Sequence, residues 1–121
     1  MPQRFRSWEH LRRPDDFRRV YDRKRSVSDE RLIVYACENG TAFSRLGMSV
    51  SRKAGPAVAR NRLRRLYREA FRLLKGELPT GLDLILIPRG TTEPSLEEVK
   101  ASLLKLIPQA ARRLGKEAKP T

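Results

Sequence analysis

The stretch AVARNRLRRLYREAFRLLK, residues 57–75, decides the fold. On a helical wheel of about 100° per residue, its apolar side chains gather on one side. That side comprises Ala59, Leu63, Leu66, Tyr67, Ala70, Phe71, Leu73 and Leu74. Gly55 and Pro56 precede the pattern, and Gly76 and Pro79 end it. The sequence therefore predicts one amphipathic helix that packs its apolar side on the core.

The other side of this predicted helix is almost wholly cationic. Its basic residues number seven, six of them Arg, and the only acid is Glu69. A solvated helix face, the usual explanation of a charge run, carries acids at i,i+4 that offset the repulsion. Arg also favours paired hydrogen bonds with phosphates. We therefore predict a face that binds a nucleotide backbone, formed by Asn61, Arg64, Arg65, Arg68, Arg72 and Lys75, with Arg60 and Arg62 at its borders.

The whole chain has the same sign of charge. Its 121 residues include 27 Lys and Arg against 14 Asp and Glu, which gives a formal net charge of +13. Such an excess favours a polyanionic partner. The length predicts one domain over residues 1–121, with an ordered core over about 11–114 and loose ends before and after it.

The pattern offers no membrane or export segment. No run of 18 apolar residues occurs, so we expect no membrane span. Four acids interrupt the basic first 25 residues and no apolar segment follows them, which argues against a signal or transit peptide. We therefore expect a cytoplasmic protein.

Residues that carry catalytic or metal chemistry are sparse. The single Cys37 cannot form an internal disulfide, and with the lone His10 it cannot build a zinc site. We expect Cys37 to be a buried strand residue and His10 to lie in an unstructured lead. A two-metal nuclease needs clustered carboxylates, but Asp83 stands alone and other acids lie at predicted helix starts. The sequence therefore predicts a binding protein with no catalytic residue and no metal ligand of its own.

The segments before the decisive stretch predict a helix and two strands. Pro14 begins a short helix over about 14–24. Apolar or alternating residues predict strands over 31–38 and 45–51. Asn39-Gly40 favours a turn that joins these two strands as an antiparallel hairpin.

The segments after it predict a strand over 82–88 and a last helix. Ser95 and Glu98 have capping-box spacing at the start of that helix, which Pro108 kinks or interrupts. The residues alone predict the order α, β, β, α, β, α, with helices on one side of a three- or four-stranded sheet. The residue pattern does not show whether a fourth strand lies near residues 25–28.

A groove is predicted on one face of the hairpin. If alternate apolar residues of 45–51 face the helices, small Gly47, Ser49 and Ser51 line the opposite face beside the strand 31–38. Tyr35 then stands in the groove, and Phe17 and Tyr21, one helical turn apart, form its wall. Aromatic rings there can stack on unpaired bases of any sequence. The alternative is that Phe17 and Tyr21 only fill the core between helix and sheet.

Three motifs resemble the protein subunit of bacterial ribonuclease P. They are RNRLRRL at 60–66 with Arg68, the preceding LGMSVSRK at 46–53, and LRRPDDFRRVY at 11–21. The similarity covers about residues 11–107 in the family's order. One departure is Pro56, where the family commonly has Asn, so the helix start lacks a side-chain cap and relies on the fixed φ of proline.

The resemblance implies an α+β fold of order α-β-β-β-α-β-α. This is a two-layer sandwich, ribosomal protein S5 domain 2-like, with a left-handed β-α-β crossover that general rules would not predict. It also implies that a large catalytic RNA with bound Mg²⁺ removes the 5′ leader of precursor tRNA, and that the protein is its accessory subunit.

The resemblance also assigns roles to residues of this sequence. It implies RNA contacts by Arg52, Lys53, Arg60, Asn61, Arg62, Arg64, Arg65, Arg68 and Arg72. It places Phe17, Tyr21, Tyr35, Ser49 and Ser51 in a cleft that receives the single-stranded leader. No protein partner and no membrane are implied.

Other classes of protein remain as alternatives at this point. A ribosomal or chaperone-like RNA-binding protein would share the charge and the fold, but it would not assist leader cleavage. A membrane-surface module would need the apolar helix side for lipid, whereas the strands need it for the core. Catalysis by the protein itself would require cleavage by the purified chain without RNA.

Overall fold

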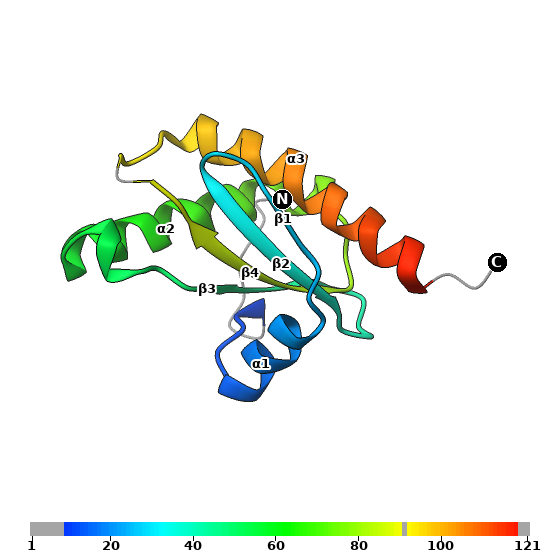
Figure 1. Ribbon diagram of the computed structural model, residues 1–121. Helices are drawn as coiled ribbons and strands as arrows, with labels where there is room; N and C mark the ends of the chain where they lie inside the picture. Colours follow the sequence, from blue (N-terminus) through cyan, green and yellow to red (C-terminus); the bar gives the residue numbers. More distant parts are fainter. Residues whose placement is uncertain (1–8, 91, 119–121) are drawn as a thin grey trace.

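The computed structural model describes residues 9–90 and 92–118 (Figure 1). Four strands and three helices follow one another in the order α-β-β-β-α-β-α, which confirms the predicted α+β class. The elements are α1 (Pro14–Asp22), β1 (Ser26–Ser28), β2 (Leu32–Glu38), β3 (Arg45–Met48), α2 (Ala57–Leu74), β4 (Leu82–Pro88) and α3 (Leu96–Ala118), with 3-10 turns η2 (Arg52–Ala54) and η3 (Lys75–Glu77).

The sheet has the strand order β1-β2-β4-β3, so the predicted hairpin of 31–38 with 45–51 is wrong. Strand β4 lies between them, antiparallel to β2 and parallel to β3. The reason is burial: the first five residues of β4, Leu82 to Leu86, are all buried, and a strand that is buried on both faces belongs in the centre of a sheet. The chain does turn at Asn39-Gly40, as predicted. The strand that follows, β3, then pairs with the edge of β4 that faces away from β2.

The fourth strand is β1, which pairs antiparallel with β2. It has only three residues, with Val27 buried between two more exposed serines. Lys24 adopts a left-handed φ of +57° directly after α1 and turns the chain toward this strand. Three residues are too few for an alternating pattern to stand out in the sequence.

Helices cover both faces of the sheet, not one face as the residue pattern predicted. Helices α2 and α3 pack on one face over Val34, Leu84 and Leu86. Helix α1 packs on the other face, where Val20 meets Cys37 and Ile85. Figure 1 shows α1 below the sheet and α3 above it. Alternate residues of β2 and β4 therefore serve two separate cores.

Helix α2 has the predicted bounds and nearly the predicted apolar face. Its buried residues are Leu63, Tyr67, Ala70, Phe71 and Leu74. Leu73, which the wheel placed at the edge of the apolar side, is 38% exposed, so its assignment to the core is wrong. Pro56 takes the N-cap position in an extended conformation and makes no side-chain cap, as expected from its chemistry.

Helix α3 begins with the predicted capping box. The Ser95 amide donates to Glu98 Oε1 at 2.8 Å, and the Glu98 amide donates to Ser95 Oγ at 3.1 Å. The helix continues through Pro108 to Ala118, so the loose tail predicted from Gly115 is wrong for these residues. Buried side chains on both sides of the proline, Ile107 and Leu114 among them, offset the hydrogen bond lost at Pro108.

Of the lead predicted to be loose, the structure describes Glu9 and His10, which pack against the rest of the chain; residues 1–8 lie outside the described residues. The Glu9 side chain is buried and lies 2.9 Å from Lys75 Nζ. His10 forms a parallel bridge with Leu46, and the Leu11 amide donates to the Leu46 carbonyl at 2.8 Å. This segment therefore covers the free edge of β3, and an edge strand needs such cover.

Candidate nucleic-acid interface

The cationic face of α2 carries the residues predicted for it except Lys75, which lies in η3 and pairs with the buried Glu9 at 2.9 Å. Asn61, Arg62 and Arg65 are exposed, and Arg60, Arg64, Arg68 and Arg72 are partly buried. Besides Glu9, two acids reach this surface: Glu69 pairs with Arg72 at 2.6 Å, and Glu93 pairs with Arg62 at 3.4 Å. Arg62 lies at the predicted border of the face, whereas Arg72 lies near the C-terminal end of α2 and is partly buried.

The centre of the face has no acidic partner in the described part of the chain. Arg64 donates only to the neutral amide of Asn61, at 2.9 Å. No ion pair of Arg64, Arg65 or Arg68 occurs within residues 9–90 and 92–118. The guanidinium groups therefore remain available to bind an anion, which is what a phosphate-binding surface requires.

The segment before α1 adds charge to this face. Burial, followed by the nearby positive charges of Arg64 and Arg12, lowers the pKa of Arg68. Burial, followed by Arg12 and Arg68, likewise lowers the pKa of His10. The repulsion between neighbouring positive charges lowers their pKa values, and an anion that binds between them reduces this repulsion. Arg12 thus joins the cationic face, and only the pairing of its neighbour Leu11 with β3 brings it there.

The turn η2 presents two further cations beside the start of α2. Arg52 and Lys53 are both exposed. Ser51 does not continue the strand as predicted: β3 ends at Met48, and Ser51 caps η2, where its Oγ accepts a hydrogen bond from the Lys53 amide at 2.9 Å. A hydroxyl that satisfies a backbone amide in this way fixes the direction of the turn.

The residues predicted for the aromatic cleft lie on the α1 face of the sheet, but Gly47 is buried beneath Phe17 and Leu11 and does not form the open floor that was predicted. Tyr35 of β2 and Gly47 of β3 are both in register with Ile85 of β4, so the three residues form one row across the sheet. The ring centroids of Tyr21 and Tyr35 are 5.0 Å apart in an edge-to-face arrangement, and those of Phe17 and Tyr21 are 6.5 Å apart.

The three rings are partly buried, so they pack on the core and also keep exposed surface. Ser49 follows Gly47 by two residues, is exposed, and donates its backbone amide to the Leu86 carbonyl at 3.0 Å. It therefore continues the line of β3 along the cleft. The neighbour of this line is β4, not β2 as the predicted hairpin required.

Asp83 anchors α1 to the sheet through partners that the sequence analysis did not predict. Its buried carboxylate accepts hydrogen bonds from Arg45 Nε at 2.8 Å and Asn39 Nδ2 at 3.0 Å, and it pairs with Arg19 of α1. Burial by itself would raise the pKa of Asp83, but the donors from Arg45, Asn39 and Arg19 outweigh it and lower the pKa. This cluster holds the helix that carries Phe17 and Tyr21.

Metal-ligand clusters and membrane-spanning helices are both absent from the described residues. No three His, Cys, Asp or Glu side chains within 9–90 and 92–118 come together as metal ligands would. None of the helices described is both long and apolar enough to cross a membrane. Cys37 is buried, as predicted, and burial raises the pKa of its thiol.

The sequence matches the family model described as Ribonuclease P over residues 5–111. It is 40% identical over 108 residues to the ribonuclease P protein component of Thermoanaerobacter sp., covering 88% of this chain and 93% of that protein. It is 39% identical over 98 residues to the ribonuclease P protein component of Alkaliphilus oremlandii, covering 80% of this chain and 86% of that protein.

Solved structures agree with the sequence matches. The RNase P protein from Thermotoga maritima superposes with a TM-score of 0.77 at 37% identity, covering 84% of this chain and 96% of the other. The RNase P protein of Staphylococcus aureus superposes with a TM-score of 0.73 at 32% identity, covering 86% and 95%. The chain therefore belongs to the ribonuclease P protein family, whose members are the protein subunit of the endoribonuclease that processes tRNA.

Proposed function

We propose that the cationic face of α2, with Arg12 and η2 beside it, binds the catalytic RNA of ribonuclease P. The observation that carries this proposal is the group of Arg64, Arg65 and Arg68, which has no acidic partner in the described chain. These three guanidinium groups have no anion in the described chain to offset their charge. When they bind RNA phosphates, counterions condensed on the RNA are released, which favours binding.

The aromatic cleft binds the single-stranded 5′ leader of precursor tRNA in this proposal. Phe17, Tyr21 and Tyr35 supply partly exposed rings on which unpaired bases stack, at about 1–3 kcal/mol per base. Stacking does not read the sequence, so it suits leaders of differing sequence. Ser49 offers a hydroxyl beside the rings, whereas Ser51 acts through its cap on η2.

The protein supplies binding and positioning to a reaction carried out by the RNA subunit. Phosphodiester hydrolysis then uses Mg²⁺ held by that RNA. A chain of net charge +13 reduces the repulsion between the catalytic RNA and the precursor tRNA, which are both polyanions. The result is tighter substrate binding and fuller occupancy of the functional Mg²⁺ sites of the RNA.

Reconstitution tests this function. The purified chain is mixed with a bacterial ribonuclease P RNA and end-labelled precursor tRNA at a low Mg²⁺ concentration. We expect release of the leader that neither the RNA nor the protein gives alone under these conditions. Equal release with and without the protein would reject the proposed role, and release by the protein alone would place catalysis in the chain.

A further inference from the structure

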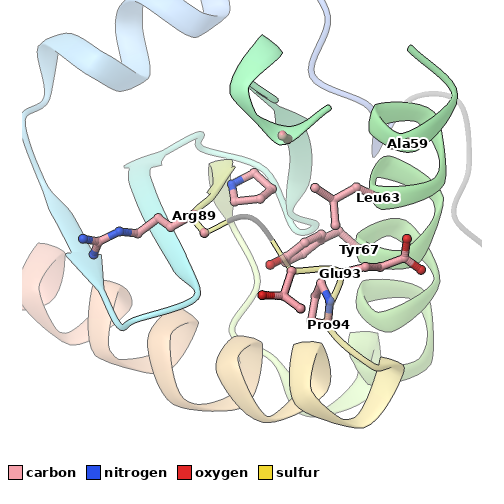
Figure 2. A pocket seen from close by; sticks show the side chains of 10 residues that line it. Ala59, Leu63, Tyr67, Arg89, Glu93 and Pro94 are labelled. Atoms are coloured by element: carbon pink, nitrogen blue, oxygen red, sulfur yellow. The ribbon is translucent and has the colours of Figure 1, made fainter. Parts of the chain in front are cut away.

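The two faces of the sheet carry different features outside the cationic face. On the α2 face, a pocket lies between α2 and the segment before α3, with Tyr67 and Pro94 in its wall, as Figure 2 shows. None of the described residues that line it belongs to the aromatic group of Phe17, Tyr21 and Tyr35. On the α1 face, a row of polar side chains crosses the sheet beside that group. The polar row is therefore the feature that can act on the aromatic side chains.

The polar row and the aromatic row are neighbours on one face of the sheet. Cys37 of β2 and Arg45 of β3 are both in register with Asp83 of β4. The next row on this face, two residues along each strand, contains Tyr35 and Gly47. Helix α1 packs on both rows. Contacts that fix the helix on the polar row therefore also fix its aromatic side chains on the next one.

Two residues of α1 and two of the sheet form a closed network of alternating charges, called the charge network below. Arg19 pairs with Asp83, which accepts a hydrogen bond from Arg45 Nε at 2.8 Å. Arg45 Nη2 lies 3.6 Å from Asp16 Oδ1, and the same oxygen lies 3.5 Å from Arg19 Nη2, which closes the network. Its two positive and two negative charges cancel. Arg19 and Arg45 therefore differ from the central arginines of α2, which have no acidic partner in the described part of the chain.

The charge network defines the position of α1 more sharply than apolar packing does. Of the residues of α1, which are all described, Val20 alone is buried. Gly47 has no side chain that would stop the Phe17 ring from sliding along the sheet. Apolar contact has no preferred direction, whereas a guanidinium bonds a carboxylate in a fixed plane. Arg19 also donates to the Glu38 carbonyl at 3.3 Å, which adds a second point of attachment to the sheet.

We propose that Arg19 is a positioning residue for leader binding, because the charge network holds α1 where Phe17 and Tyr21 can stack on leader bases. The inference rests on the proposed binding of the leader by these aromatic side chains. Arg19 acts without touching RNA, since Asp83 and Asp16 already balance its charge. Loss of Arg19 should therefore weaken binding of the leader and spare the phosphates that the cationic face of α2 binds.

Direct contact with a leader phosphate is the competing role of Arg19, because 40% of its side chain is exposed. Salt dependence separates the two roles. A lost phosphate contact lowers the slope of log affinity against log salt by about 0.7 for single-stranded RNA, whereas a displaced helix leaves the slope unchanged. We expect an unchanged slope for Arg19→Gln, and a slope lowered by that amount would overturn the positioning role.

The test uses the enzyme assembled from the full chain and a bacterial ribonuclease P RNA, with precursor tRNA and mature tRNA as ligands. We expect Arg19→Gln to weaken binding of precursor tRNA about tenfold, the contribution of one stacked base, and to leave binding of mature tRNA unchanged. The cleavage rate at saturating precursor tRNA should stay at the wild-type value, so that KM rises and kcat does not. Affinity of the catalytic RNA for the variant should also match the wild type.

A second variant opens the charge network from its acidic side. Asp16→Asn removes a negative charge, which by electrostatics alone would tighten binding of a polyanion. The positioning role predicts the opposite sign, so Asp16→Asn should weaken binding of precursor tRNA. The matched control is Asp15→Asn, which makes the same change at an exposed residue outside the network and should not weaken binding.

A third variant controls for a general loss of stability. Asp29 is a buried carboxylate away from α1 that accepts a hydrogen bond from Ser102 Oγ of α3 at 2.8 Å. Asp29→Asn should lower the Tm and leave the preference for precursor over mature tRNA unchanged. An equal loss of that preference in Asp29→Asn and Arg19→Gln would reduce Arg19 to a stabilising residue and overturn the proposal.

The remaining outcomes separate this proposal from the proposed function. An unchanged preference for precursor tRNA in Arg19→Gln, or unchanged or tighter binding of precursor tRNA by Asp16→Asn, would overturn the positioning role while leaving leader binding in place. A wild-type enzyme with no preference for precursor over mature tRNA would reject leader binding itself, and the positioning role with it.

Discussion

The ring of Phe17 lies directly over the backbone of Gly47. A Cβ atom built on Gly47 would be 2.7 Å from Phe17 Cζ and 3.1 Å from Leu11 Cβ. The lack of a side chain at position 47 therefore sets how closely α1 approaches β3, and with it the position of the Phe17 ring on the sheet.

Gly47→Ala should disturb this contact. The added methyl overpacks the α1 face, and overpacking costs about 1–3 kcal/mol of the free energy of unfolding. We expect a lower Tm and weaker binding of precursor tRNA, with binding of the catalytic RNA retained. Thermal unfolding and filter binding of both RNAs check this. A variant with unchanged Tm and unchanged precursor binding would show that the close approach is not required.

Phe17→Ala should weaken binding of precursor tRNA by the assembled enzyme more than binding of mature tRNA. Loss of one stacked base costs about 1–3 kcal/mol, and only precursor tRNA carries a leader. Because Phe17 also packs against the buried cluster on the α1 face, Phe17→Leu serves as the control that keeps apolar volume. The affinity of both tRNAs for the reconstituted enzyme is the measurement. Equal losses for both tRNAs would make Phe17 a structural residue only.

The two strongest sequence predictions were those with local signals. Helix α2 follows from apolar spacing bounded by Gly55 and Pro79, and the Ser95–Glu98 capping box fixes the start of α3. These signals depend on neighbours within four residues, so no knowledge of the tertiary structure is needed.

The strand order β1-β2-β4-β3 could not be predicted from the local sequence pattern. Asn39-Gly40 indicates a turn correctly, but a turn does not determine which strand fills the space beside β2. The proximity of Arg12 to Arg68 likewise depends on the pairing of Leu11 with Leu46, a contact between distant segments. Residue type and alternation placed Phe17, Tyr21 and Tyr35 on one face of the sheet, but they did not identify β4 as the strand beside Gly47.

Asp83→Asn should destabilise the chain, because it removes the charge that Arg19 and Arg45 share. Breaking a buried ion pair costs about 3–5 kcal/mol. Since the folded-state pKa of Asp83 is below its unfolded value, this stability is present above about pH 4 and is lost as the pH falls through the folded pKa. The difference in unfolding free energy between the two proteins should therefore shrink in acid.

Urea unfolding at several pH values measures that difference. Asp15→Asn is the matched control, since Asp15 forms an exposed pair with Arg18 and its loss should change stability by less than about 0.5 kcal/mol. A difference between wild type and Asp83→Asn that stays constant down to pH 3 would contradict the assignment.

Tyr67→Phe should stabilise the isolated chain. Removing an unsatisfied buried hydroxyl recovers about 1–3 kcal/mol of desolvation cost while keeping the apolar volume of the ring. Urea unfolding without RNA checks the sign. A destabilised variant would show that the hydroxyl is already hydrogen-bonded in the free protein.

The central claim is that the unpartnered arginines of α2 bind the phosphates of the catalytic RNA. The most direct test is the affinity of that RNA for the chain over a range of salt concentrations, for Arg65→Ala, Arg68→Ala and the control Arg112→Ala on the exposed side of α3. We predict that each α2 variant binds more weakly and that its slope of log affinity against log salt falls by about 0.7–0.9, while Arg112→Ala matches the wild type. Identical affinities and slopes for all four proteins would contradict the claim.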